Sequence, residues 1–423
     1  MQTIGDKLDA RRGMGPGFDF LRVALAVGIV VWHSFGVARN PVWGDGTPFA
    51  WIFGYGMLVM FFSLSGFLIS GSAQRLKLHD FLINRGLRIF PALGVEIALS
   101  ALVLGPLFTT LTLGEYFRDP GTASYFTNIV GKMNFHLPGV FLSNPVSVVN
   151  WSLWTVPHEF VCYAIMSALM ITGFLRRPSV VLMAIVFIIA AGFIGEAGAF
   201  KSLGFVGRVL DFLFVGRGSR LYVGFLLGIT MYLYRHRIPY SAILFAAAVG
   251  ICVVVAAIGP AKWMSYPALA CILALPLAYI TAFLGATDLP TLPVFHHGDY
   301  SYGVYLYGMP VQQTMVALFP SVRDPLLQLG LALPVIILFS MFSWHVIEKP
   351  VLALRKRSLL RREGQGCRRG GSVESRRTRS WTGRRRPCFR AERVGERPGS
   401  IRDPGRYAKP TVTGKMRRTC NSR

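Results

Sequence analysis

Long apolar runs recur along this chain, and they restrict its fold more than any other feature of the sequence. About 20 apolar residues in a helix, at roughly 1.5 Å per residue, span the hydrocarbon core of a bilayer. Hydrophobic residues make up 52% of the 423 residues and charged residues only 15%, whereas a soluble domain has about 25% charged residues. The sequence therefore predicts an all-α, polytopic membrane protein. It excludes a disordered, collagen-like or disulfide-stapled chain.

Ten runs are long enough to read as spans, which predicts a bundle of about ten transmembrane helices. They cover residues 19–37, 51–71, 88–112, 157–175, 178–195, 219–235, 240–259, 264–284, 301–319 and 326–347. The fourth and sixth runs are the weakest. The preceding residues 200–218 are amphipathic and could lie in the membrane interface instead.

The chain divides into an N-terminal segment (1–18), a transmembrane domain (19–352) and a basic tail (353–423). Residues 351–423 hold 23 of the 45 Lys and Arg against 5 of the 20 acids. A tail rich in Arg, Gly, Ser and Pro without apolar periodicity is predicted to be disordered. It could bind anionic lipid head groups, or it is a passive or out-of-frame extension. Nonspecific binding of nucleic acid is not expected to be its function.

The basic residues between the spans indicate an orientation. With ten spans, one side of the membrane receives most of the basic residues, and that side is predicted to be cytoplasmic and to hold both termini. These residues are Lys7, Arg11, Arg12, Arg75, Lys77, Arg85, Arg88, Arg176, Arg177, Arg235 and Arg237. The other side has few basic residues, apart from Lys201, Arg208, Arg217 and Arg220 in the amphipathic stretch.

The first span carries an ionisable stripe. Arg22 and His33 are eleven positions apart, so at about 100° per residue they lie on one helix face, separated by roughly 16 Å. Asp19 falls on nearly the same stripe. Histidine is the usual general base at neutral pH, and Arg suits a phosphate or pyrophosphate. The alternative is a His that hydrogen-bonds a neighbouring helix and an Arg that marks the membrane boundary.

Spans two and three contribute small and charged residues. Ser63, Ser65 and Gly66 favour close helix packing, and a serine nucleophile is the less favoured reading. Arg85 and Arg88, three positions apart, would form a two-Arg clamp for the phosphates of a nucleotide-type cofactor, or they anchor the helix at the cytoplasmic boundary. Glu96 lies deeper in span three and is expected to pair with Arg22 or another intramembrane base.

Residues 150–163 (NWSLWTVPHEFVCY) place His158 and Glu159 at the entry of span four. They could orient a catalytic base or a sugar hydroxyl, or they belong to a wet interfacial cluster. Residues 298–313 place Tyr302 on a helix that Asp299 and Ser301 are expected to cap. Glu348 and Lys349, before Pro350, read as a structural stop. The six cysteines form no CxxC pair and no Cys/His spacing, so no metal site is expected.

Together these segments resemble the acyltransferase family 3, bacterial polytopic O-acyltransferases that modify surface glycans and Nod factors. The matching blocks occur in the family's order over about residues 18–352. They are FDFLRVALAVGIVVWHS, FFSLSGFLIS, NRGLRIFP, NWSLWTVPHEFVCY, GDYSYGVYLYGMPVQQ and IEKP. This chain departs from the family's pattern at His158, where many members have Tyr, and at Gly308, where many have His.

The resemblance implies roles for individual residues. It implies that Arg22 and His33 are catalytic, that Arg85 and Arg88 engage acyl-CoA, and that Glu159 is functional. Substrate-contacting or orienting roles are expected for Asp19, Ser65, His158 and Tyr302. No permanently bound cofactor is expected.

The resulting hypothesis is a membrane O-acyltransferase of the bacterial inner membrane. Acetyl-CoA would donate from the cytosol, and the acceptor would be a hydroxyl of a polysaccharide, lipopolysaccharide or lipid-linked saccharide, with membrane lipids around it. His33 would remove the hydroxyl proton or shuttle the acyl group, and Glu159 or Asp19 would orient the imidazole. The alternative is a transporter or flippase of lipid-linked glycans, which usually shows inverted repeats; none is evident here.

Overall fold

The structure, a computed structural model, describes residues 2–11, 15–38, 50–259, 265–289 and 298–355. The described part is helical. Two isolated β-bridges, Thr3–Pro239 and Thr109–Val140, are its extended pairings. The prediction for the tail beyond residue 355 lies outside the described residues.

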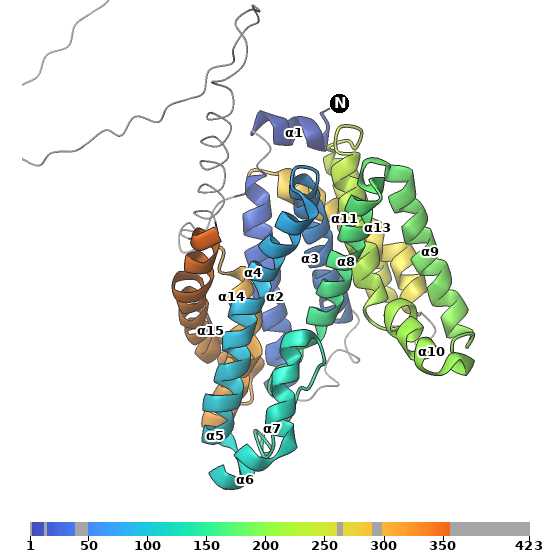
Figure 1. Cartoon of the computed structure of the whole chain (residues 1–423). Coiled ribbons are helices and arrows are strands. Elements are labelled where there is room, and N and C mark those ends of the chain that lie inside the picture. The colour runs from blue at the N-terminus through green and yellow to red at the C-terminus, as the bar shows by residue number, and fades with distance from the viewer. Residues whose placement is uncertain (1, 12–14, 39–49, 260–264, 290–297, 356–423) are drawn as a thin grey trace, which may run out of the picture. The chain divides into compact units, whose positions relative to one another are not determined.

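Each predicted apolar run overlaps a helix (Figure 1), although the helix Leu78–Leu99 begins ten residues before the predicted run 88–112. The helices are α1 (Ile4–Ala10), α2 (Pro16–Ala38), α3 (Ala50–Ala73), α4 (Leu78–Leu99), α5 (Gly105–Phe108), α6 (Leu113–Arg118), α7 (Pro120–Tyr125), α8 (Val156–Ile171), α9 (Pro178–Glu196), α10 (Gly204–Leu210), α11 (Ser219–Leu233), α12 (Ala242–Ile258), α13 (Tyr266–Ala286), α14 (Ser301–Leu318) and α15 (Pro325–Phe342). Three π-helical turns extend α4, α10 and α15, over Ser100–Leu104, Asp211–Val215 and Ser343–Glu348. Short 3-10 turns cover Phe126–Val130, Trp151–Thr155, Phe174–Arg176 and Lys201–Leu203.

Seven helices of the described residues are long and apolar enough to cross a membrane, and the count is eight if residues Lys201–Val215 and Ser219–Leu233, bent by 53°, form one span. Two of the ten predicted spans lie outside even the set of eight. The apolar helix α12 has only 17 residues, and α14 carries the buried amides Gln312 and Gln313. The all-helical, multi-pass architecture is therefore confirmed, while the number of spans that meet this criterion is lower than ten.

Local sequence signals explain where several helices begin. Ser241 and Ser265 accept hydrogen bonds from the backbone N–H groups of Leu244 and Ala268, which satisfies donors that a helix start leaves free. Pro178 occupies the first turn of α9, where its missing N–H costs nothing. These caps set the entry points of three apolar helices.

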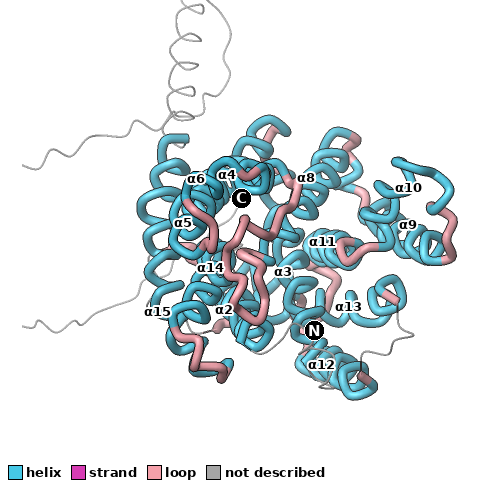
Figure 2. Tube along the Cα trace, turned by 90° about the horizontal axis from the view of Figure 1, so that it is seen from below, coloured by secondary structure: helices cyan, strands magenta, loops and turns pink. Residues whose placement is uncertain are grey.

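The centre of the bundle is formed by α2, α3, α11, α13 and α14 (Figure 2). Helix α11 packs along α3 and is buried from Ser219 to Met231. Glycines allow this approach, because a Cβ on Gly66 would overlap the Phe225 carbonyl oxygen, and one on Gly228 would overlap that of Ser63. The close packing predicted for the Ser63–Gly66 segment is thus confirmed.

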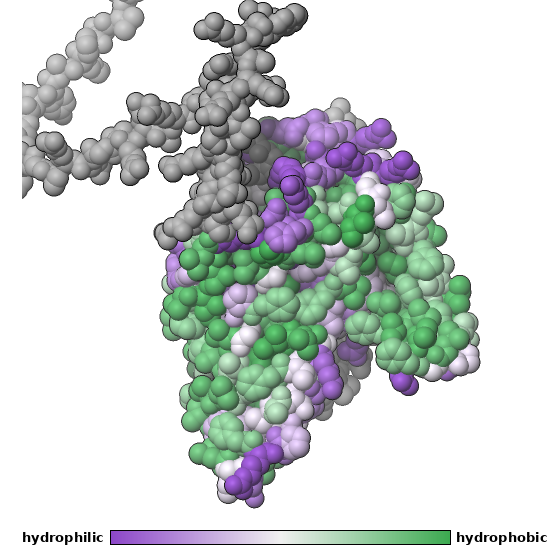
Figure 3. Space-filling view, in the orientation of Figure 1, coloured by the Kyte–Doolittle hydropathy of each residue, from purple (hydrophilic) through white to green (hydrophobic). Residues whose placement is uncertain are grey.

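The two ends of the bundle differ in charge. We call the end that holds α1 and loops 74–77, 172–177 and 234–241 the basic end (Figure 1). The opposite end holds residues 109–150, which contain α6 and α7. The sides of the bundle are mostly apolar (Figure 3), as lipid contact requires.

Candidate functional site

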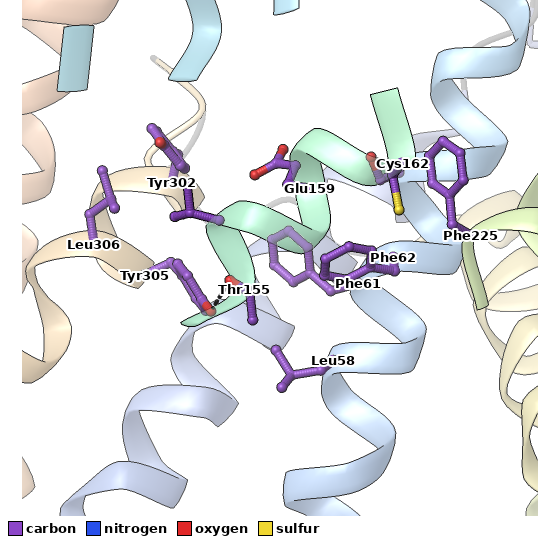
Figure 4. Close-up of a pocket in the computed structure, with 12 residues that line it drawn as sticks. Leu58, Phe61, Phe62, Thr155, Glu159, Cys162, Phe225, Tyr302, Tyr305 and Leu306 are labelled. Atoms are coloured by element: carbon purple, nitrogen blue, oxygen red, sulfur yellow. Dashed lines mark hydrogen bonds between the residues drawn. The ribbon is translucent and has the colours of Figure 1, made fainter. Parts of the chain in front are cut away.

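An internal cavity lies between α3, α8, α11 and α14 (Figure 4). Its volume is about 80 Å³, which is room for several water-sized groups, because one water needs roughly 10–15 Å³ of such space. Its wall is mainly apolar, with a few polar groups. The lining residues are Leu58, Phe61, Phe62, Ser65, Thr155, Val156, Glu159, Cys162, Phe225, Tyr302, Tyr305 and Leu306. A small apolar cavity with convergent polar groups is typical of a ligand site.

Three of the predicted site residues, Ser65, Glu159 and Tyr302, meet at this cavity. Glu159 lies in the first turn of α8 and accepts a hydrogen bond of 2.5 Å from Tyr163, one helical turn later. Arg85 and Arg88 are the cations that act on the Glu159 carboxylate. The cavity therefore places a carboxylate within electrostatic reach of the two predicted donor-binding arginines.

The Ser65 hydroxyl is a free donor at the cavity wall. Ser70 and Ser72 on the same helix donate to the carbonyl oxygens of Gly66 and Ile69, at 2.7 and 2.8 Å. Within the described residues, Ser65 has no hydrogen bond. Its hydroxyl can thus bond to a group that enters the cavity.

Arg88 occupies an ion-pair cluster on the basic-end side of the cavity. It donates to Asp299 at 2.7 Å and to Glu348 at 2.5 Å, and Arg22 donates to Asp299 at 3.1 Å. The Arg88 guanidinium also lies 5.6 Å from the centre of the Tyr302 ring, which links this cluster to the cavity wall. We call Arg22, Arg88, Asp299 and Glu348 the charge cluster.

Two residues of the charge cluster, Asp299 and Glu348, were not predicted from the sequence to pair with arginines. The N-cap residue of α14 is Tyr300. Asp299 pairs with the arginines, and its other oxygen accepts a hydrogen bond of 2.5 Å from the Ser301 hydroxyl at the start of the helix. Burial opposes its ionisation, but Arg88 and Arg22 hold the pKa of the Asp299 carboxyl below its usual value. Glu348 is 1% exposed and also accepts from Ser343, so it is more than a helix stop. An acidic residue at the end of an apolar run was the sequence signal that could have identified Glu348 as a functional candidate.

The two predicted arginines of the clamp are not equivalent. Arg88 is engaged by two carboxylates, whereas the Nε of Arg85 is buried without a hydrogen-bond partner in the described part of the chain. Arg85 otherwise faces the Phe81 ring, with 5.9 Å between its guanidinium carbon and the ring centre. Arg85 is therefore the more available of the two for an incoming anion.

Asp19 and His33 occupy different levels of α2. The Asp19 carboxylate is 84% exposed and lies 3.8 Å from Arg22, roughly 21 Å along the helix from His33. His33 is half-buried and does not line the cavity. It lies beyond Val30, whose carbonyl oxygen accepts from Gln312 on α14, whereas the cavity meets α14 at Tyr302–Leu306. The structure does not bring Asp19 to His33.

His158 and Glu159 point to different sides of α8. The His158 Nδ1 atom lies 2.6 Å from the Tyr222 hydroxyl, and its ring stacks on Phe212 at 4.7 Å. His158 is 5% exposed and does not line the cavity. Of the neighbouring pair, Glu159 faces the cavity and His158 faces α10 and α11.

Glu96 was expected to pair with Arg22 or another intramembrane base, and among the described residues it forms neither ion pair. It accepts hydrogen bonds from Ser100 at 3.0 Å and from Asn150 at 2.9 Å. Asn150 also donates to the Leu306 carbonyl oxygen, so the amide joins α4 to α14. Glu96 thus anchors Asn150, the N-cap residue of the 3-10 turn Trp151–Thr155 that precedes α8.

The comparisons with known proteins agree with this architecture. The profile of a family described as an acyltransferase domain matches residues 16–345. The chain belongs to the acyltransferase 3 family. This acyltransferase contains the cavity and the charge cluster within the matched residues, apart from Glu348.

Two curated relatives cover most of the acyltransferase. An O-acetyl transferase of Shigella phage Sf6 is 26% identical over 356 residues, covering 79% of this chain and 95% of the relative. Nodulation protein 10 of Rhizobium leguminosarum bv. viciae is 26% identical over 389 residues, covering 85% of this chain and 99% of the relative. No solved structure matches the chain. Acyl transfer, rather than glycan transport, is the activity of the family.

Proposed function

We propose that this acyltransferase transfers an acetyl group from acetyl-CoA to a hydroxyl of a cell-surface or lipid-linked saccharide, in a bacterial inner membrane with the basic end in the cytosol. The observation that carries the proposal is the cavity that joins the free Ser65 hydroxyl and Glu159 to Arg85 and the charge cluster. The similarity to an O-acetyl transferase supports acetyl as the group and oxygen as the acceptor atom.

The donor would enter from the basic end. Its phosphates would meet Arg85 first, because the Arg85 Nε has no partner in the described residues. Arg22 and Arg88 would add positive charge from within their ion pairs. The thioester would then reach the cavity past Tyr302, which contacts both the cavity and Arg88.

The acyl transfer itself needs three functions. The acceptor hydroxyl oxygen bonds to the thioester carbon, the carbon–sulfur bond breaks, and CoA leaves as a thiolate. The Ser65 hydroxyl donates a hydrogen bond to the bound donor and orients it in the cavity. His33 takes the hydroxyl proton and returns it to the thiolate. Glu159 accepts a hydrogen bond from the acceptor and holds it in place.

The level of His33 fits an acceptor that arrives from the opposite end. His33 lies on the opposite-end side of the cavity, beyond the contact between Val30 and Gln312. A hydroxyl between His33 and the cavity would therefore meet the base on one side and the thioester on the other. This arrangement separates the donor and acceptor entrances.

The proposal can be tested with inside-out vesicles given labelled acetyl-CoA. Wild-type protein should label the saccharide fraction, and His33→Ala should reduce that label at least about 100-fold, since general base catalysis contributes roughly 10²–10⁴-fold. His79→Ala is the matched control, because His79 is 68% exposed at the start of α4; it should retain full activity. Full labelling by His33→Ala would refute the assigned base.

A further inference from the structure

Arg220 is a buried cation that the acyl transfer described above does not use. It is the second residue of α11 and is 7% exposed. Among the described residues Arg220 forms no ion pair. The charged side chain that influences it there is Arg217, another cation. A buried charge is costly unless it is paired, so this position needs an explanation beyond helix packing.

Two tyrosine rings enclose the Arg220 guanidinium. Its central carbon lies 4.6 Å from the ring centre of Tyr55 on α3 and 5.4 Å from that of Tyr266 on α13. Contacts of this kind stabilise a cation by about 0.5–2 kcal/mol. They leave its N–H groups without acceptors, because ring faces engage the charge and not each N–H.

Two polar atoms at this place are buried and unsatisfied. In the part of the chain that is described, neither the Arg220 Nε nor the Tyr55 hydroxyl has a hydrogen-bond partner. Burying such an atom without a hydrogen bond costs about 1–3 kcal/mol. Both atoms can donate, so a group with several acceptor oxygens and negative charge would satisfy them together.

The position of Arg220 relates it to the cavity. Arg220 precedes the cavity residue Phe225 by five positions on α11, which is roughly 7.5 Å along the helix axis. Since α11 runs toward the basic end, Arg220 lies on the opposite-end side of the cavity, where His33 also lies. A ligand held at Arg220 is therefore close enough to present another of its groups to the cavity.

The surface beside Arg220 is apolar and suited to contact with lipid. The neighbouring α9 and α10 expose large apolar side chains, including Val186 at 67%, Phe187 at 62% and Phe205 at 73%, and Figure 3 shows this flank as predominantly apolar. The same stretch carries Lys201, Arg208 and Arg217, an unusual group of cations for this side of the predicted topology. Anionic head groups are the ligands that such a border attracts.

We infer that Arg220, Tyr55 and Tyr266 form a binding site for the phosphate of a lipid that approaches from the opposite end. The guanidinium and the Tyr55 hydroxyl donate to the phosphate oxygens, and the two rings hold the guanidinium in place. The phosphate belongs either to an anionic phospholipid or to the carrier of a lipid-linked acceptor. Only the second source rests on the proposed function.

The test measures lipid binding directly and is independent of acyl transfer. Purified full-length protein in detergent is titrated with phosphatidylglycerol, polyprenyl phosphate or zwitterionic phosphatidylcholine, and bound lipid is counted by native mass spectrometry. The variant is Arg220→Met, and Arg118→Met is the control, because Arg118 is exposed at the end of α6, outside the stretch 201–220. At least a 10-fold loss of affinity for the anionic lipid is expected for Arg220→Met alone.

Each outcome of this titration supports or overturns the inferred phosphate site. A loss with phosphatidylglycerol assigns a structural lipid site, and a loss confined to polyprenyl phosphate assigns an acceptor site. Equal binding of the anionic lipids by wild type and Arg220→Met would overturn the inference. So would a wild type that binds neither anionic lipid better than phosphatidylcholine.

A second variant keeps the test valid if Arg220→Met does not fold. Tyr55→Phe keeps the ring and removes a hydroxyl that has no partner in the described residues. Without anionic lipid it should unfold at the same temperature as wild type or higher. Its affinity for the anionic lipid should fall about 3- to 10-fold. Unchanged affinity would show that the hydroxyl does not face a bound phosphate.

Discussion

Arg88 and Arg220 are both guanidinium groups inside the helical bundle, but their surroundings differ. Arg88 is 21% exposed and bonds to two carboxylates, Asp299 and Glu348. Arg220 is more buried, at 7% exposed, and lies between the rings of Tyr55 and Tyr266. A cation that is paired within the protein stabilises the fold, whereas a cation that lacks an anion is available to a ligand.

The difference also separates the two sides of the cavity. On the basic-end side, charge pairs fix α2, α4, α14 and the end of α15 relative to one another. On the other side, His33 and Arg220 lack such pairs among the described residues. The first side is suited to hold a fixed shape for a donor, and the second to receive a ligand with charge of its own.

The largest effect is expected for Arg88→Met. The substitution leaves Glu348, which is 1% exposed, without its cation, and breaking a buried pair in this way costs roughly 3–5 kcal/mol. We expect a clear fall in the thermal unfolding midpoint. Arg220→Met should change the free energy of unfolding by no more than about 1 kcal/mol, since it removes an unpaired charge. Equal destabilisation by both variants would contradict the comparison.

A rescue experiment sharpens that prediction. Adding Glu348→Gln to Arg88→Met replaces the stranded carboxylate by a neutral amide, which no longer needs a cation. Part of the lost stability should return in the double variant. A double variant that is less stable than Arg88→Met would show that Glu348 is held by Ser343 and not chiefly by Arg88.

Arg85→Gln should have an intermediate effect, on donor binding rather than on stability. Arg85 forms no ion pair with the described residues and its Nε lacks a partner, so the fold should tolerate the loss. Removing one charge-assisted contact to a donor phosphate should raise the KM for acetyl-CoA about 10-fold, or roughly 1.4 kcal/mol. Initial rates in vesicles at varied acetyl-CoA give this value, with Lys77→Gln at the exposed basic end as the control.

The charge cluster predicts an acid sensitivity that is smaller still. Arg88 and Arg22 lower the pKa of Asp299, so its contribution to stability is present above the pKa of an unfolded Asp and is lost as the pH falls through the lowered value. Between about pH 6 and about pH 3, the thermal unfolding midpoint should fall less steeply with decreasing pH for Asp299→Asn than for wild type. Parallel curves would show that other carboxylates set the acid limit.

The smallest effect is expected at the exposed pair of Arg11 and Asp288. These side chains are 59% and 51% exposed and lie 2.9 Å apart. Exposed pairs contribute about 0–1 kcal/mol. Arg11→Gln should therefore leave the unfolding midpoint unchanged within error, and it serves as the reference for the effect at Arg88. A large destabilisation would mean that the α1 segment is held by this pair.

The sequence determined the class of this protein and most of its helices. Apolar runs of about 20 residues favour membrane helices regardless of neighbours, and each predicted span overlaps a helix. The spacing of Arg22 and His33 on one helix face follows from the helix period alone. The ordered blocks were sufficient to identify the family, and the match over residues 16–345 confirms it.

Only the tertiary structure decided which charged residues meet. Arg88 and Glu348 are 260 positions apart, and Glu96 bonds to Asn150 instead of Arg22. Helical periodicity gives the face of a side chain but not the helix that covers it. That choice depends on how α2, α4, α14 and α15 pack together. For the same reason, the burial of Arg220 between two tyrosines followed from the packing of α3, α11 and α13.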